Sequence, residues 1–544
     1  MKKSISLFIS LVLLLGVLPV NFAQVAQAAA PGTYNPGDIA VINNIIDNNG
    51  LNWPKAPEDG SSVPEGWCYE LAIWDWTDDT DDIALESVVS STEEGNRAGV
   101  FWSDDVSNKR VKKLIFEEDS LIGDLNLNGL DKLVYLDCGF NELTSLDLSN
   151  NTNLVHLDCG FNKLTSLDLR NNPLLEKLIS YNSAFTSLDL SANTKLELLW
   201  LSGVALTSLD ISNNLALKNL YCGGNSLTSL DASNHTKLEW LECDTGKLTS
   251  LDVSGCVALK TLTCWNNELT SLDVSKCAKL EYLECGSNKL NSLDVGKLSS
   301  LTDLDCSNNK LTSLDVKSLS VLTYLDCSDN KLTSLDASGC VTLSALFCGE
   351  NNLETLDVSG CASLEGLSCS GNKLKKLDLS GNPMLDDLYC NDNLLTSLDL
   401  SNKSRLMHLR CDNNRLSKLD VSNCPSITYL DCSYNKLTSL DVSDCTWLVW
   451  LYCHHNHFSS QNNIIGIENV SKVFYDPQNV PQIDETTTTA TKKPTTTVAE
   501  TTTTTDLASP ETGDSTPAAF ALFAGFAALL TGAAFCVDRR RKAR

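Results

Sequence analysis

A pattern of 21 residues recurs through most of this chain and restricts what it can fold into. One copy, residues 322–342, reads LTYLDCSDNKLTSLDASGCVT, and the period continues from Cys138 to Cys453 through sixteen coils. A fixed period of this length is the signature of stacked repeats, in which each unit buries its apolar face only against its neighbours. The length of 544 residues therefore reflects the number of coils and not the size of one globular core.

Each copy consists of two similar halves. Leu325 and Cys327 lie two positions apart in the first half, and Leu335 and Ala337 repeat that spacing in the second. Apolar residues at i and i+2 share one face of a strand, whereas a helix would place them on different sides. The pattern predicts two short strands per coil, joined by tight turns.

These halves, LxxLxCxxNxL followed by LxxLxAxxC, resemble the leucine-rich repeat family and its bacterial subtype of nested 21-residue repeats called IRREKO. The resemblance covers residues 111–458. It implies a mainly β solenoid with a parallel β-sheet on the concave face, a second row of short strands and turns on the other face, and a small helical amino-terminal cap. It also implies a partner bound along the concave sheet.

The amino-terminal part of the chain precedes the repeats. Lys2 and Lys3, an apolar run over residues 5–18 and Ala26-Gln27-Ala28 are typical of a secretory signal peptide spanning residues 1–28. Residues 29–110 are predicted to form a cap on the first coil, because a solenoid otherwise exposes the apolar face of its first unit; the alternative is an independent ligand-binding module. Within this region the spacing of isoleucines predicts a helix over residues 36–49 that stops at Gly50.

The carboxyl-terminal part carries a second targeting segment. Residues 509–513, SPETG, precede an apolar stretch at 518–537 and a basic tail, and the whole of 509–544 resembles the cell-wall sorting signal of Gram-positive surface proteins. The resemblance implies that sortase cuts between Thr512 and Gly513 and joins the chain to peptidoglycan. The family motif begins with leucine where this chain has Ser509. The alternative is a plain transmembrane anchor, and both readings place the repeats outside the cell.

Between the repeats and this segment the composition changes. The solenoid with its closing cap is expected over residues 111–480, and the Thr-rich residues 481–508 contain almost no large apolar side chains. Such a segment cannot bury a core, so it is predicted to be an extended stalk. The net charge of −28 excludes nucleic acid as a partner, because phosphates would be repelled.

Cysteine and aspartate each recur at a fixed position of the repeat, in what we call a column, and these columns are the candidates for metal binding or disulfide formation. Fourteen cysteines occupy one inward column, where Leu201 also occurs, which favours buried thiols over a metal ladder. The pairs 256/277, 340/361 and 424/445 could cap turns or form coil-to-coil disulfides. Aspartates from Asp147 to Asp441 are expected on the outer surface, held by neighbouring hydroxyls or by calcium. Sequence signatures of enzymes are absent, and no cofactor or metal is predicted.

The columns that vary from coil to coil carry the functional information. Positions flanking the inward Leu and Cys of the first strand point outward and hold aromatic residues among acids, whereas the second strand repeats Ser and Asp almost unchanged. Aromatic side chains on a diversified surface are typical of recognition. The predicted ligand-binding residues are Tyr135, Trp200, Tyr221, Trp240, Trp265, Tyr282, Tyr324, Phe347, Tyr389, Tyr429, Trp450 and Tyr452.

These observations predict an extracellular, non-enzymatic binding protein anchored to the Gram-positive cell wall. The expected partner is a protein or peptide on a host or neighbouring cell. A glycan, stacked on the aromatic rings, and a purely structural spacer are the alternatives. Sortase and peptidoglycan are the partners implied by the sorting signal, and contact with a membrane is expected only through residues 518–537.

Overall fold

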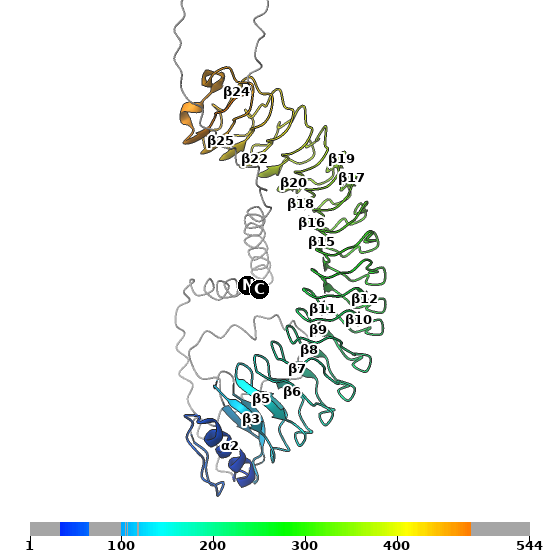
Figure 1. Ribbon diagram of the computed structural model, residues 1–544, viewed down its shortest axis with the longest axis vertical. Coiled ribbons are helices and arrows are strands. Elements are labelled where there is room, and N and C mark those ends of the chain that lie inside the picture. The colour runs from blue at the N-terminus through cyan, green and yellow to red at the C-terminus, as the bar shows by residue number, and fades with distance from the viewer. Residues whose placement is uncertain (1–32, 65–98, 104, 106, 117–118, 480–544) are drawn as a thin grey trace, which may run out of the picture. The chain divides into compact units, whose positions relative to one another are not determined.

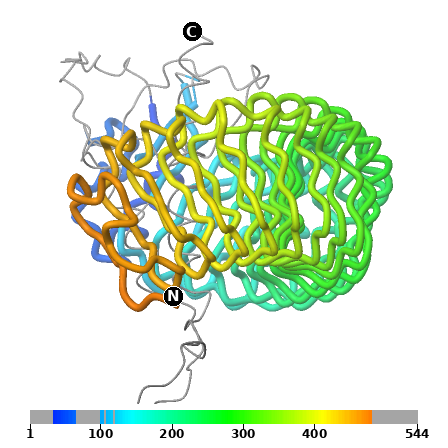
Figure 2. Tube along the Cα trace, turned by 90° about the horizontal axis from the view of Figure 1, so that it is seen from above, coloured from blue at the N-terminus to red at the C-terminus, as the bar shows by residue number. Residues whose placement is uncertain are grey.

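The computed structural model describes residues 33–64, 99–103, 105, 107–116 and 119–479, which form a curved stack of coils (Figure 1). Seen from above, successive coils lie side by side with their turns in line (Figure 2). The predicted signal peptide, the Thr-rich segment and the sorting signal with Thr512 and Gly513 lie outside the described residues. Within the described residues, no helix combines the length and apolarity needed to cross a membrane.

The helix α2 (Pro36–Asn49) confirms the helix predicted before the repeats. Its N-cap residue, Asn35, accepts a hydrogen bond from the backbone N–H of Asp38, and Gly50 ends the helix in the left-handed region at φ 63°. One face of α2 packs into the same core as the leucines of the coils. The buried residues of this face are Ile39, Ile42, Ile45 and Ile46.

Asp38 ties α2 to the first strands of the sheet. Its carboxylate is fully buried and accepts hydrogen bonds from Arg110 Nη2 at 2.9 Å and from the backbone N–H of Val111 at 2.8 Å. A buried carboxylate needs such donors, because its desolvation is otherwise unfavourable.

A large sheet lines the concave side of the stack (Figure 1). In the described part of the chain it has 19 strands. The first two pair antiparallel, and every later strand adds in parallel and in chain order. Leucine lies opposite leucine in the pairs of three-residue strands, except in the last pair, where Leu451 faces Val473. The strands are β1 (Gly99–Trp102), β2 (Val111–Ile115), β4 (Tyr135–Asp137), β6 (His156–Asp158), β7 (Lys177–Ile179), β8 (Leu198–Trp200), β9 (Asn219–Tyr221), β11 (Trp240–Glu242), β13 (Thr261–Thr263), β14 (Tyr282–Glu284), β15 (Asp303–Asp305), β16 (Tyr324–Asp326), β18 (Ala345–Phe347), β20 (Gly366–Ser368), β21 (Asp387–Tyr389), β22 (His408–Arg410), β23 (Tyr429–Asp431), β25 (Trp450–Tyr452) and β27 (Lys472–Phe474).

The opposite side carries the predicted second row, but as separate two-stranded pairs. Between these pairs the second half of each coil keeps its inward leucine without regular strand pairing. The pairs are β3 (Ile122–Asn126) with β5 (Glu142–Asp147), β10 (Ser229–Asp231) with β12 (Ser250–Asp252), β17 (Ser334–Asp336) with β19 (Thr355–Asp357), and β24 (Leu440–Asp441) with β26 (Ile464–Ile465). The 3₁₀ turns η2 (Gln461–Asn463) and η3 (Ile467–Asn469) lie near the end of the stack.

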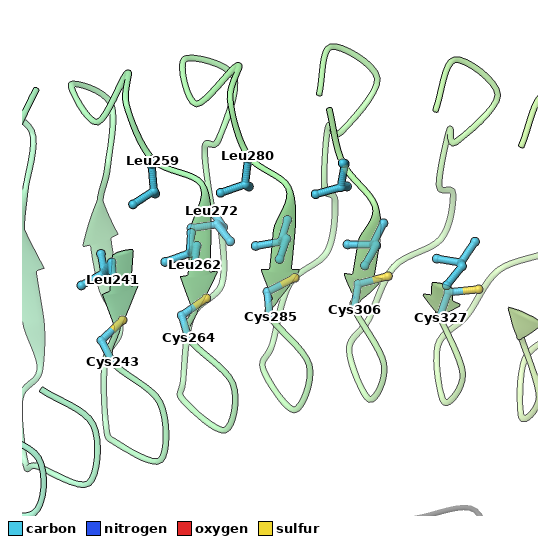
Figure 3. Close-up of a cluster of buried hydrophobic side chains, with 14 of the residues drawn as sticks. Leu241, Cys243, Leu259, Leu262, Cys264, Leu272, Leu280, Cys285, Cys306 and Cys327 are labelled. Carbon is cyan, nitrogen blue, oxygen red and sulfur yellow. The ribbon is translucent and has the colours of Figure 1, made fainter. Parts of the chain in front are cut away.

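The interior consists of rows of leucine beside a row of cysteine, as Figure 3 shows for the central coils. Cys243, Cys264 and Cys285 follow the inward leucines of β11, β13 and β14, and all three are buried and free. Burial raises the pKa of the Cys264 thiol to about 12, so the thiolate is strongly disfavoured. Buried thiols acting as small apolar residues are therefore confirmed for this column.

Buried asparagines close the turn that follows each cysteine. Asn309 donates through Nδ2 to the carbonyls of Cys285 and Cys306 at 3.0 and 3.2 Å, and its Oδ1 accepts from the backbone N–H of Leu290 at 2.9 Å. We call this column the asparagine ladder: Asn141, Asn162, Asn225, Asn267, Asn288, Asn309, Asn330, Asn351, Asn372, Asn393, Asn414, Asn435 and Asn456. The ladder satisfies backbone groups that the turns leave unpaired.

Three residues interrupt the ladder: Ser183, Val204 and Gly246. The loss of the asparagine predicts a distorted turn at Val204 and at Gly246. Beside Val204, Ala205 adopts φ 82°, a left-handed conformation unusual for alanine, which confirms the predicted distortion. Beside Gly246, Thr245 has φ 52°, the same conformation that Asn266 has in the following coil. The prediction of a distorted turn at Gly246 is therefore wrong, because the left-handed residue before the ladder position maintains the turn.

A second column caps the turns of the other half-coil. Asn382 Nδ2 donates to the carbonyl of Val358 at 2.9 Å, and Cys340 Sγ makes the equivalent contact with Val316 at 3.2 Å. The cysteines of the three pairs are free thiols here, and asparagine and cysteine have the same capping role. Lys403 occupies this column as well, buried to 1% exposure, with Nζ donating to the carbonyl of Leu379 at 2.9 Å.

The aspartates of the second half-coil form a uniform outer row. Asp273, Asp294 and Asp315 each accept a hydrogen bond on Oδ1 from the backbone N–H two residues later, at 2.9 to 3.2 Å. The same bond holds the pKa of Asp273 below its usual value. These carboxylates therefore stabilise turns within their own coil, and we call their column the aspartate rail.

Candidate binding site on the concave sheet

The predicted ligand-binding residues lie on the solvent side of the large sheet, with one exception. In β16 the middle residue, Leu325, is buried, whereas Tyr324 and Asp326 on either side are half-buried and face outward. Eleven of the twelve predicted residues occupy such flanking positions, and Trp265 lies in the turn after β13. Tyr221 is only 6% exposed, so its neighbours cover it more fully than its column predicts.

Three of these residues join three others in a continuous row of aromatic rings. The ring centroids of consecutive members lie 4.6, 4.9, 4.9, 5.3 and 6.1 Å apart. We call this row the aromatic ladder; its members are Phe140, Phe161, Tyr181, Trp200, Tyr221 and Trp240. Its first members lie in the turns after the strands, and its last member, Trp240, is the first residue of β11. The row therefore runs obliquely over six coils.

Phe140 and Phe161 are missing from the sequence-based prediction. Both are about 40% exposed and precede a member of the asparagine ladder, at φ 53° and 48°. A left-handed turn position normally favours Gly, Asn or Asp, so two aromatic residues there, one period apart, were an available signal.

The stacking leaves little open ring face along the aromatic ladder. Phe140 and Phe161 are stacked at an interplanar angle of 24°, as are Tyr181 and Trp200. Trp265 differs, because it is 39% exposed and has no aromatic neighbour among the described residues. The aromatic ladder therefore offers ring edges to a partner, and Trp265 offers a ring face.

Four half-buried carboxylates follow the aromatic ladder along the chain. We call Glu242, Glu284, Asp305 and Asp326 the acidic belt; they hold the third position of β11, β14, β15 and β16. Glu284 pairs in register with Asp305, and Asp305 with Asp326, so three carboxylates lie on adjacent strands. At the ~4.8 Å spacing of neighbouring strands, like charges repel.

Burial and mutual repulsion perturb the belt. Burial, together with the charges of Asp244 and Glu284, raises the pKa of Glu242 to about 7. Burial and the charge of Asp305 raise the pKa of Asp326 to about 6. In the part of the chain that the structure describes, no lysine or arginine forms an ion pair with the belt. The centre of the concave face is therefore a region of uncompensated negative charge.

The last coils carry a second aromatic group. Tyr452 lies between Tyr429 and Phe474, with ring centroids 5.5 and 4.3 Å away, and Lys472 Nζ lies 3.8 Å from the ring centroid of Trp450. Tyr324 and Phe347 form a smaller pair at 5.7 Å. The described residues contain no group of three or more His, Cys, Asp or Glu side chains placed to hold a metal ion.

Comparison with known proteins identifies the class of solenoid. No family model matches the sequence, and no curated protein matches it. The structure of the functional domain of InlJ from Listeria monocytogenes, which includes a cysteine ladder, matches at 35% identity and a TM-score of 0.55, over 59% of this chain and 74% of that chain. A leucine-rich repeat protein of Leptospira interrogans matches in fold at 23% identity and a TM-score of 0.52, over 60% and 92%. The chain belongs to the leucine-rich repeat family.

A further match shows how widely this fold is shared. The structure of YopM from Yersinia enterocolitica matches the leucine-rich repeat chain at 25% identity and a TM-score of 0.50, over 67% of this chain and 87% of that chain. Leucine-rich repeat solenoids typically serve as non-enzymatic scaffolds for interaction with other proteins, since their coils extend a surface without enclosing a cavity.

Proposed function

We propose that this leucine-rich repeat protein is an extracellular, non-enzymatic binding protein that recognises a protein or peptide partner through its concave sheet. One observation carries the proposal: the two faces of the solenoid differ in diversity. The aspartate rail repeats one side chain that serves its own turn, whereas the concave face combines the aromatic ladder, the acidic belt and the carboxyl-terminal aromatic group. Side chains without a structural task are free to serve recognition.

The test is binding of candidate surface proteins of host or neighbouring cells to the full chain. Trp200→Ala with Trp240→Ala should weaken binding by at least tenfold, because truncating central aromatic residues of an interface costs more than about 1–2 kcal/mol. Asp273→Asn on the aspartate rail is the matched control and should bind normally. Equal binding by both variants would place the interface elsewhere.

The surface location is part of the same proposal and rests on the sequence of residues 1–28 and 509–544. In a Gram-positive host that expresses sortase, digestion of peptidoglycan should release the chain from the cells. Thr512→Ala should shift the chain to the membrane fraction or the medium. Unchanged release after this substitution would exclude covalent attachment at Thr512.

A glycan is the second candidate partner, and Trp265 favours it. Its exposed ring has the open face that stacking on a sugar requires. Binding to a glycan array that disappears in Trp240→Ala with Trp265→Ala would support this alternative. No binding to proteins or glycans would leave the structural spacer as the remaining reading.

A further inference from the structure

Four glutamates of the described coils form ion pairs with a lysine of the next coil, whereas the carboxylates of the acidic belt form none. The ion-paired groups lie 2.7 to 3.0 Å apart and are separated by one period of 21 residues. The pairs are Glu142 with Lys163, Glu197 with Lys218, Glu239 with Lys260, and Glu268 with Lys289. The belt lies in the same range of coils without such a lysine. It differs from Asp273 of the aspartate rail, which forms no ion pair in the described coils either, because burial raises the pKa of Glu242, Glu284 and Asp326, whereas Asp273 keeps a lowered pKa.

Unsatisfied polar atoms lie beside these carboxylates. Trp240 Nε1 and Thr263 Oγ1 are inaccessible to solvent and have no hydrogen-bond partner within the described chain. Trp240 shares β11 with Glu242, and Thr263 lies between Glu242 and Glu284 in the register of the sheet. Buried donors of this kind are normally satisfied, so a chain laid across β11 and β13 would supply acceptors once the side chains that cover the two atoms shift aside.

We propose that the partner segment is a cationic, extended peptide that lies across the acidic belt, with an apolar side chain against the Trp240 end of the aromatic ladder. This inference rests on the proposed function and adds the chemistry of the partner. The belt spans four strand spacings, or about 19 Å, which corresponds to an extended segment of about six residues. Alternate residues of such a segment face the same way, so about three lysines or arginines reach the belt.

The electrostatics of the belt agree with this partner. The pKa of Glu284 is raised by burial and by the charges of Asp305, Asp244 and Asp303. Burial raises the pKa of Tyr324 above its usual value, and the neighbouring carboxylates raise it further. Burial is the larger cause of both shifts, and repulsion by the neighbouring carboxylates is the smaller one. A bound cation relieves that repulsion, and a neutral or acidic segment does not.

Calorimetric titration of the full chain with three peptides tests the inference. Each is a capped heptapeptide in which serine alternates with arginine, glutamine or glutamate. We expect the arginine peptide to bind, the glutamine peptide to bind at least tenfold more weakly, and the glutamate peptide not to bind. The affinity for arginine should fall as ionic strength rises, because partly exposed charges are screened.

Two triple variants separate the belt from the overall charge of the protein. Glu284→Gln with Asp305→Asn and Asp326→Asn removes three charges but keeps the oxygens that accept from Tyr282 and from the backbone of Ser307 and Ser328. Asp273→Asn with Asp294→Asn and Asp315→Asn removes three charges from the aspartate rail and likewise keeps its acceptors.

The belt variant should lose about tenfold in affinity for the arginine peptide, and the rail variant should change less than twofold. Equal binding by the two variants, or no preference for arginine over glutamine, overturns the inference. Selection of binding peptides from a random library on the full chain distinguishes a failure of the cationic-peptide inference from a failure of the proposed binding function. Peptides that depend on Trp200 and Trp240 but carry no excess of basic residues would overturn the cationic partner alone. If no peptide and no protein binds the concave face, both proposals fail.

Discussion

Replacing one member of the asparagine ladder tests how much a single side chain contributes to the stack. Asn309→Ala removes the bonds from Nδ2 to the carbonyls of Cys285, Cys306 and Ser307 and the bond that Oδ1 accepts from Leu290. A buried backbone group left without a partner costs about 1–3 kcal/mol. With at least two such groups, the expected loss is about 3–5 kcal/mol, a large part of the stability of an ordinary domain.

Hydrogen exchange measured by mass spectrometry is the appropriate assay, because a solenoid can open locally without unfolding as a whole. The amide of Leu290 and its neighbours should exchange at least a hundredfold faster in Asn309→Ala. Lys310→Ala alters an exposed neighbour in the same turn and should leave exchange unchanged. Asn309→Asp keeps the acceptor and loses the donor, so it should protect Leu290 better than alanine does. A loss below about 1 kcal/mol with unchanged exchange at Leu290 would refute the account of the ladder.

Three further measurements follow from buried ionisable groups. The pKa of Glu242 is about 7 in the folded chain against an ordinary value of 4.5, so between these pH values the folded state binds more protons than the unfolded state, and stability falls as pH rises. Glu242→Gln should therefore raise the free energy of unfolding by about 1–2 kcal/mol at pH 8 and hardly change it at pH 4, as measured by denaturant unfolding. Burial lowers the pKa of Lys403, so the charged lysine destabilises the folded state at neutral pH, and this cost disappears as pH rises toward 10.5. Lys403→Asn should therefore raise the melting temperature at pH 7, by an amount that decreases toward pH 10.5. An unchanged melting temperature at pH 7 would contradict this. Thiols of the inward column, such as Cys306, should resist iodoacetamide at pH 8 in the native chain and react fully in denaturant, as read by intact mass; rapid native labelling would show that the column opens.

The fold was predictable because it repeats. An error in one coil is corrected by the others, so the inward leucines, the cysteine column and the asparagine ladder follow from the period alone. The helix over residues 36–49 was predictable for a local reason, because its isoleucine spacing and Gly50 signal one amphipathic helix.

Individual departures from the repeat were harder to predict. A lysine such as Lys403 reads as an exposed side chain, yet its long stem carries Nζ to the carbonyl of Leu379 inside the turn. The aromatic ladder joins different columns, so its contacts depend on the curvature of the stack and on rotamers. The acidic belt required knowing which lysines reach which carboxylates. These features depend on contacts between different coils, whereas aligning the repeats shows only which residue type recurs at each position of a single coil.

The register of the large sheet also limits how the protein can change in length. Each parallel strand pairs with the strand one coil away, and each ladder asparagine bonds the backbone of its own coil and the preceding one. Removal of any block of 21 residues brings together two ends that already match, whereas a block of another size misaligns every column after it. Variants of this chain should therefore differ by whole coils. Such changes would move the two aromatic groups toward or away from each other, and would thereby adjust the length of partner that spans them.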